Sequence, residues 1–237
     1  PGIKESITLK HSQEAGLRFF MEQGSALWDF EAGIGKTPTA YAAAMEAMHN
    51  NGAKKVLIIA PAKLRKQFAD DAKVFLDKDN AKLVKNAGTM KDRKTRLATY
   101  ERETGIDIVG HDTLTNDADA LAAAGYDMVI VDEMHEMTPQ GKGKGSQRYR
   151  GMQKLIDVPM KIGMSGTNIK NSKTELHRKV DFLFPDHDLG TLEQFEKKYK
   201  GLNQGTSAFQ DSSNDAFRKA VAPYMYSQKN NLDVSLT

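Results

Sequence analysis

The chain has 237 residues, enough to bury one large hydrophobic core, and its 39% hydrophobic and 27% charged residues are typical of a globular protein. The formal net charge of +3 is too small to indicate nucleic-acid binding unless the basic residues are unevenly placed. Cysteine is absent, which excludes a disulfide framework and thiolate zinc sites. No apolar run approaches the roughly 18 residues of a membrane span and no secretion signal is found, so we expect a cytoplasmic, nucleoid or nuclear protein without membrane contact.

Apolar runs alternate with helical patterns along most of the chain, which predicts an α/β fold with a mostly parallel sheet flanked by helices on both faces. We expect five strands, at residues 26–28, 55–60, 106–109, 128–131 and 161–164. Helices are expected at residues 39–48 and on the apolar face formed between 64 and 76, and mobile stretches at 140–147 and 201–214. Because each strand ends in polar or small residues, these ends should meet at one ligand site.

The first candidate for that site follows the strand at 26–28, where two glycines precede a lysine and a threonine. The glycines allow backbone N–H groups to approach phosphate oxygens, the lysine would reach the β and γ phosphates, and the threonine hydroxyl would bind magnesium. Phe30 stands where a full phosphate loop has its first glycine. The alternative is a plain glycine turn with a solvated lysine. The residues expected to bind the nucleotide here are Gly33, Ile34, Gly35, Lys36 and Thr37.

A second candidate, Asp132 and Glu133, follows the apolar strand at 128–131. Two adjacent carboxylates at the edge of a sheet repel each other unless a cation lies beside them, and Mg²⁺ would meet that need. Asp132 would hold the ion and Glu133 would polarise an attacking water, so Lys36, Asp132 and Glu133 are the predicted catalytic residues, with Thr37 and Asp132 on the metal. A solvated acidic turn is the alternative. Together, the two motifs in this order predict binding of ATP and Mg²⁺.

The order of the motifs resembles the first RecA-like lobe of superfamily 2 helicases, in the Swi/Snf-type DNA translocase branch. That resemblance implies a RecA-like P-loop NTPase lobe that binds ATP, with Gln13 sensing the adenine. It also implies a lobe over residues 1–226, with 227–237 starting a linker to a second, missing C-terminal RecA-like lobe. The matching segments are residues 9–13, 31–37, 60–64, 110–114, 132–135 and 164–171, followed by 175–176, 182–186 and 192–195.

Contacts with nucleic acid are expected from two sources. The resemblance places Lys63, Thr113, Lys170 and Asn171 near a duplex backbone. Independently, a local basic run with Tyr149 between two arginines suits phosphate contact, although a solvated flexible loop would explain it equally well. This run contains Lys142, Lys144, Arg148 and Arg150. A further basic cluster, Lys91, Arg93, Lys94 and Arg96, also fits an ordinary exposed helix face.

The leading hypothesis is the ATP-binding lobe of a DNA-dependent ATPase that couples hydrolysis to movement along duplex DNA. Because arginines of the second lobe complete the ATP site in this branch, the isolated chain should bind nucleotide and hydrolyse it weakly. The alternatives are a DExH RNA helicase lobe, a non-catalytic nucleotide-binding or DNA-docking module, and a small-molecule kinase. The last of these leaves the matches after residue 164 without an explanation.

Overall fold

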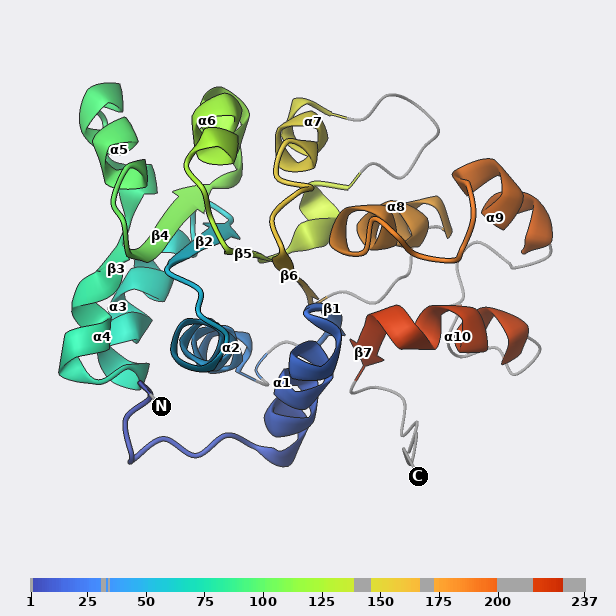
Figure 1. Cartoon of the computed structure of the whole chain (residues 1–237), viewed down its shortest axis with the longest axis horizontal. Helices are drawn as coiled ribbons and strands as arrows, with labels where there is room; N and C mark the ends of the chain where they lie inside the picture. Colours follow the sequence, from blue (N-terminus) through green and yellow to red (C-terminus); the bar gives the residue numbers. More distant parts are fainter. Residues whose placement is uncertain are drawn as a thin grey trace.

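The computed structural model describes residues 2–30, 33, 35–138, 146–166, 173–199 and 215–227. A seven-stranded sheet with the order β3-β4-β2-β5-β6-β1-β7 forms the centre of the fold, and every strand pair in it is parallel (Figure 1). The strands are β1 Ser25–Asp29, β2 Lys55–Ala60, β3 Val84–Lys85, β4 Gly105–Gly110, β5 Met128–Val131, β6 Met160–Ser165 and β7 Met225–Ser227.

Helices connect the strands as parallel crossovers require. They are α1 His11–Gln23, α2 Lys36–Asn50, α3 Arg65–Phe75, α4 Lys78–Leu83, α5 Arg93–Tyr100, α6 His111–Ala123, α7 Gln147–Gln153, α8 Lys173–Leu183, α9 Leu192–Lys198 and α10 Asp215–Val221, with the short turn η2 at Met134–Glu136.

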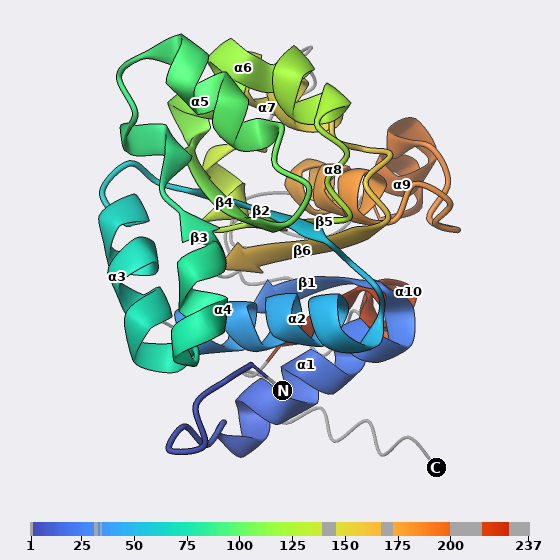
Figure 2. The same ribbon diagram turned by 60° about the vertical axis from the view of Figure 1, so that its left-hand side comes forward.

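Helices cover both faces of the sheet (Figure 2). Helices α1 to α4 lie on one side, where the core contains Trp28, Ile58 and Ile108, and α5 to α9 lie on the other, where the core contains Leu57 and Val109. Successive strand residues point to opposite faces, so a strand covered on both sides is apolar throughout rather than alternating. The near-continuous apolar runs in the sequence have this cause, and the α/β fold with a sheet covered on both faces is confirmed.

The five predicted strands are present, each extended by no more than two residues at its ends. Two further strands, β3 and β7, form the edges of the sheet and were not predicted. The helix expected at 39–48 begins earlier, so Lys36 and Thr37 lie in its first turn. The prediction of a mobile stretch at 140–147 is wrong at its end, because Ser146 caps α7 and Gln147 is helical. Residues 139–145 and 200–214 lie outside the described part of the chain.

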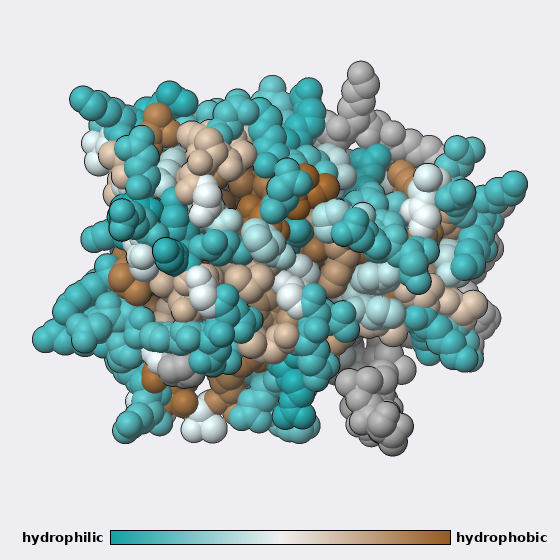
Figure 3. Space-filling model, viewed as in Figure 1, coloured by the Kyte–Doolittle hydropathy of each residue, from teal (hydrophilic) through white to brown (hydrophobic). Residues whose placement is uncertain are grey.

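Hydrophilic side chains cover most of the face shown in Figure 3, with smaller separate hydrophobic areas between them. Among the residues that the structure describes, Val74 is the only large hydrophobic residue that is exposed to solvent, at 53%. In the same described ranges, the helices all fall short of the length or the apolarity needed to cross a bilayer.

Candidate functional site

The glycine loop lies between β1 and α2, and its backbone depends on residues without a Cβ. Gly33 and Gly35 have φ angles of 86° and 96°, a region that side-chain-bearing residues rarely adopt. Gly35 is the N-cap of α2, and its carbonyl accepts a hydrogen bond from Gln13 Nε2 over 3.0 Å. Gln13 Oε1 in turn accepts from the Lys10 N–H over 2.7 Å. The Gln13 amide, 22 residues before Gly35, therefore supports the end of the loop.

The acidic pair follows β5, two strands away from β1 in the sheet. Asp132 is 3% exposed, and its N–H continues the sheet by donating to the Ile59 carbonyl over 2.8 Å. Glu133 then adopts a left-handed conformation with φ 48°, the only positive φ of a non-glycine residue in the described ranges. This conformation costs roughly 1–2 kcal/mol for an L-residue, so it persists only where surrounding contacts hold it.

Lys36 and Glu133 meet across the strand ends. Lys36 Nζ lies 2.9 Å from Glu133 Oε1, and the Gly166 N–H donates to Glu133 Oε2 over 3.3 Å. Gly166 follows β6, which lies between β1 and β5, so the ends of three neighbouring strands contribute to one cluster. A Cβ at Gly166 would lie 2.6 Å from Lys36 Nζ, so a side chain at this position would displace the lysine ammonium group. The predicted meeting of Lys36 with the acidic pair is found.

The two adjacent carboxylates have opposite pKa shifts. Burial raises the pKa of Asp132 to about 6, although the nearby Lys36 charge opposes that shift. Hydrogen bonds from His135 and Lys36 lower the pKa of Glu133 to about 2, against a smaller effect of burial. Neighbouring acids whose environments separate their pKa values are common at catalytic sites.

His135 and Ser165 complete the surroundings of Glu133. His135 Nδ1 lies 3.2 Å from Glu133 Oε2 and also 3.2 Å from Ser165 Oγ. In the sequence, His135 was of interest only because it follows the acidic pair. It also left Ser165 open between a role near these residues and a plain turn, and the structure places its hydroxyl against His135.

Phe30, which stands where a full phosphate loop has its first glycine, is fully buried in the core that also contains Trp28. Its ring packs against Trp28 and Tyr226, with ring centroids 5.3 and 5.9 Å apart, and approaches the backbone of Gly16 in α1. Phe30 thus joins α1, β1 and β7, and the departure from the phosphate-loop pattern serves packing.

A pocket of about 240 Å³ lies at the ends of β2 and β4, next to the acidic pair. Lys63 and Thr113, both expected near nucleic acid, line it, as does Arg148. Arg148 belongs to α7, and its Nη2 lies 2.6 Å from Asp112 Oδ1. The rest of the pocket wall includes one basic and two acidic residues and is formed by Pro61, Ala62, Arg65, Gly110, His111, Asp112 and Glu136.

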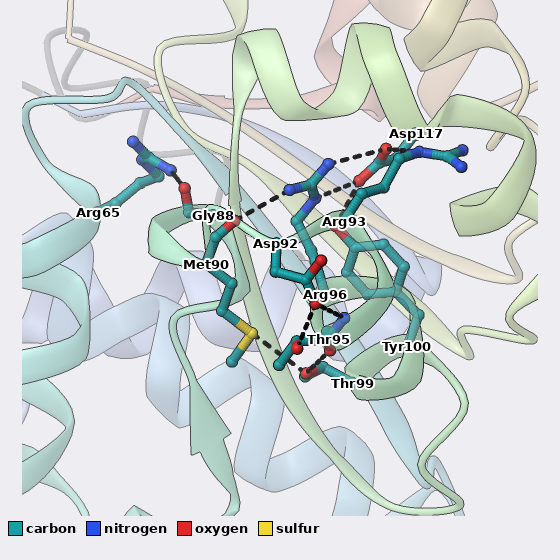
Figure 4. A network of polar contacts seen from close by, with 10 residues as sticks. All are labelled: Arg65, Gly88, Met90, Asp92, Arg93, Thr95, Arg96, Thr99, Tyr100 and Asp117. Atoms are coloured by element: carbon teal, nitrogen blue, oxygen red, sulfur yellow. Dashed lines mark hydrogen bonds and ion pairs between the residues drawn. The ribbon is translucent and has the colours of Figure 1, made fainter.

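The described residues of the two basic clusters noted in the sequence, at 142–150 and 91–96, have different surroundings in the structure. In the first, Tyr149 is half-buried with its ring 5.5 Å from the Arg178 guanidinium, so it packs within the protein. In the second, Arg93 and Arg96 pair with the buried Asp117 of α6, as Figure 4 shows; Arg93 is exposed like the two lysines, whereas Arg96 is half-buried. Ile34, Lys142, Lys144, Lys170 and Asn171 lie outside the described residues.

His111 is the site residue that sequence reasoning missed. It is 3% exposed, Nε2 lies 3.1 Å from the Asp132 carbonyl oxygen, and Nδ1 lies 3.3 Å from Glu136 Oε2. Burial lowers its pKa, against the effect of these acceptors. The signals in the sequence were its place two residues after the predicted strand at 106–109 and inside the matching segment 110–114, neither of which indicated a contact with the acidic pair.

The chain has recognisable relatives among known proteins. The family model for the SNF2-related domain matches residues 12–236. The chain is similar to the SNF2 domain-containing protein ENL1 of rice, Oryza sativa subsp. japonica (29% identity, 84% of this chain and 21% of that protein), and to the uncharacterized ATP-dependent helicase YqhH of Bacillus subtilis (25% identity, 74% and 29%). It thus spans less than a third of either relative.

A solved structure of similar fold is the Sulfolobus solfataricus SWI2/SNF2 ATPase core in complex with dsDNA, with a TM-score of 0.73 and 18% identity over 94% of this chain and 44% of that one. The RecA-like fold is thereby confirmed. Since the family model covers nearly the whole chain, the chain belongs to the SNF2-related domain family.

Proposed function

We propose that this chain is the ATP-binding lobe of a DNA-dependent ATPase that couples hydrolysis to movement along duplex DNA. The observation that carries the proposal is the contact of Lys36 with Glu133, which brings the loop lysine and the acidic pair to one place. The family supports it, and so do a relative named as an ATP-dependent helicase and a structural neighbour in complex with dsDNA.

The residues present suit a triphosphate and Mg²⁺. The two positive-φ glycines leave backbone N–H groups at the start of α2, where the helix dipole favours anions. Asp132 is a buried carboxylate with a pKa raised to about 6, and a divalent cation beside it would offset the cost of its burial. Thr37, in the first turn of α2, would add a hydroxyl oxygen to the ligands.

Bound ATP with Mg²⁺ would supply an electrophilic phosphorus and a metal charge that offsets the phosphate oxygens. Lys36 would exchange its contact with Glu133 for the phosphates. Glu133 would then lose one of the partners that lower its pKa, and so become a better acceptor for the proton of water. The Gly166 N–H and His135 would keep that carboxylate oriented. Gln13, the residue proposed to sense the adenine, would hold the end of the loop through the Gly35 carbonyl.

The pocket lined by Lys63, Thr113 and Arg148 is the proposed surface for a nucleic-acid backbone. Contacts of this kind bind phosphates with little regard to base sequence. Lys142, Lys144, Lys170 and Asn171 remain proposed contacts on the strength of the sequence alone.

The test is an ATPase and binding assay on the full-length protein that contains this chain. Lys36→Ala should abolish nucleotide binding, whereas Glu133→Gln should retain binding and lose hydrolysis by at least about 10²-fold, because only the water-activating group is changed. Lys82→Ala, on exposed α4, is the matched control and should behave as wild type.

Duplex DNA, single-stranded DNA and RNA are compared in the same assay. Greatest stimulation by duplex DNA supports the proposal, and greatest stimulation by RNA would indicate the RNA helicase. A protein that binds DNA with no turnover of ATP would be a docking module and would contradict the proposal.

A further inference from the structure

His111 contacts the backbone of the acidic pair. It is the first residue of α6, directly after β4, and its ring is buried. Nε2 lies 3.1 Å from the carbonyl oxygen of Asp132. Because a carbonyl oxygen can only accept, Nε2 carries the proton and donates this hydrogen bond.

The carbonyl that His111 holds belongs to the peptide group joining Asp132 to Glu133. The orientation of this peptide sets the start of the φ rotation of Glu133, which is 48°. A left-handed glutamate needs external support, and a buried hydrogen bond to the preceding carbonyl provides it. With that φ, the Glu133 carboxylate faces Lys36 and the Gly166 N–H.

The same ring borders the pocket at the ends of β2 and β4. Its Nδ1 lies 3.3 Å from Oε2 of Glu136, which lines the same pocket as the basic residues Lys63 and Arg148. A polyanion in this pocket would be attracted to Lys63, Arg65 and Arg148 and repelled by Asp112 and Glu136. His111 therefore lines the proposed nucleic-acid surface and also contacts the peptide group that leads into Glu133, the proposed water-activating residue.

We propose that His111 is a positioning residue that holds the Asp132–Glu133 peptide and carries the effect of a nucleic-acid backbone in the pocket to the hydrolysis of ATP. This inference rests on the proposed function. It assigns to His111 no contact with the reacting atoms, so the residue should govern the rate of hydrolysis rather than the affinity for either ligand.

The test compares two substitutions in the full-length protein. His111→Phe keeps a ring and removes the donor, whereas His111→Gln keeps an amide N–H that can reach the position of Nε2. At saturating duplex DNA, His111→Phe should lower kcat about tenfold, since small misplacements of a catalytic group cost this much or more. The KM for ATP and the DNA concentration at half stimulation should change less than about twofold, and His111→Gln should regain most of the rate.

Thermal melting of each variant separates positioning from folding, and Asp119→Asn, at an exposed site on the same helix, is the control. The inference is overturned if His111→Phe keeps the wild-type kcat, if it loses ligand affinity as much as kcat, or if His111→Gln is no better than His111→Phe with both proteins folded. Glu133→Gln in the same assay tests the proposed function separately: if it still hydrolyses ATP, the proposed function fails, whatever the His111 variants do.

Discussion

Gly35 is the residue where the loop has least tolerance for a side chain. Its φ of 96° is unfavourable for any other residue, and a Cβ there would overlap the side-chain amide of Gln13. At Gly33, with a φ of 86°, a Cβ would meet nothing within 4 Å. The two glycines thus share backbone strain and differ in available space.

We therefore expect Gly35→Ala to destabilise the chain by more than Gly33→Ala, which should cost about 1 kcal/mol from backbone strain alone. Gly35→Ala should also weaken nucleotide binding, because displacing Gln13 moves the loop. Urea unfolding and titration with a fluorescent ATP analogue measure the two effects. Equal losses in both variants would show that the Gln13 contact is unimportant.

Some site residues could be identified from the sequence because their chemistry is local. The glycines, Lys36 and the acidic pair are contiguous motifs at strand ends, and a parallel sheet brings strand ends together. His111 and Gly166 act through a ring nitrogen and a backbone N–H aimed at residues 21 and 33 positions away, and no local pattern encodes such contacts.

At the scale of elements, α5 is fixed to α6 by one buried carboxylate. The Asp117 side chain is fully buried, and it accepts from Arg96 Nε over 2.5 Å, from Arg93 Nε over 3.3 Å and from the Tyr100 hydroxyl over 3.2 Å (Figure 4). Burial acts to raise its pKa, but the arginine and tyrosine contacts outweigh this and lower it.

Asp117→Ala should cost roughly 3 kcal/mol, since it leaves the partly buried Arg96 without its carboxylate and with only the Met90 carbonyl as an acceptor. Asp119→Ala, on the same helix with a side chain 89% exposed, should change stability by about 0.5 kcal/mol or less. Urea denaturation compares them. Similar small losses in both variants would mean that α5 is held by apolar packing instead.

A second polar cluster joins α8 to the segment after it. His177 Nε2 donates to the Gly190 carbonyl over 2.7 Å, while Nδ1 lies 3.0 Å from Asp181 Oδ2. His187 accepts from the Leu189 N–H at Nδ1 over 3.0 Å, so its Nε2 carries a proton toward Asp181. These three side chains are spaced closely enough for a metal ion, but the proton on His187 Nε2 occupies the lone pair that a metal would need. The geometry favours a protonated His177.

The pKa of His177 is raised, because its hydrogen bonds to Asp181 and Gly190 outweigh the opposing effect of burial. A raised folded-state pKa gives stability that is fully present below the unfolded value of 6.5 and is lost as pH rises through the folded value. Asp181, whose pKa is lowered by both histidines despite burial, contributes above its own unfolded value of 3.8.

The free energy of unfolding should therefore differ most between wild type and His177→Gln at about pH 5, and the difference should shrink by about pH 8. Chemical denaturation at several pH values measures it. His49→Gln, at an exposed position, is the control and should show no such trend. A difference that grows with pH, or binding of Zn²⁺ that is lost in His177→Gln, would contradict a protonated cluster.

The elements that sequence patterns did not predict are short or polar. Strands β3 and β7 have two and three residues, too few to show a period, and they exist because longer neighbours offer them free edges. Helix α8 carries Glu175 and Lys179 in the interior, paired with each other over 2.5 Å. A polar sequence normally predicts an exposed face, and only tertiary contacts reveal that these charges are buried.

At the scale of the whole molecule, the chain spans 44% of the length of the Sulfolobus core, so full activity is expected to need a second lobe. We expect this chain alone to bind ATP and to hydrolyse it roughly 10³–10⁵ times more slowly than the full-length protein, the range that a missing arginine accounts for in related phosphoryl transfer. Steady-state ATPase rates of the two proteins test this. Comparable rates would show that the lobe is complete in itself.

Binding of duplex DNA by the full-length protein should weaken steeply with salt, because each phosphate contact releases counterions. Lys63→Ala should reduce the slope of log affinity against log salt by about one, without changing base preference. An affinity independent of salt would contradict phosphate contacts at the pocket.

The pairing of β7 with β1 links the end of the described chain mechanically to the strand before the phosphate loop. Ser227, its last residue, lies opposite Asp29 in the sheet, and its hydroxyl donates to that carboxylate over 3.2 Å. Because the two strands run in the same direction, β7 ends at the edge of the sheet where β1 gives way to the phosphate loop. A force applied along the chain at Ser227 would therefore reach β1, the strand that precedes the loop, through only three residues of pairing.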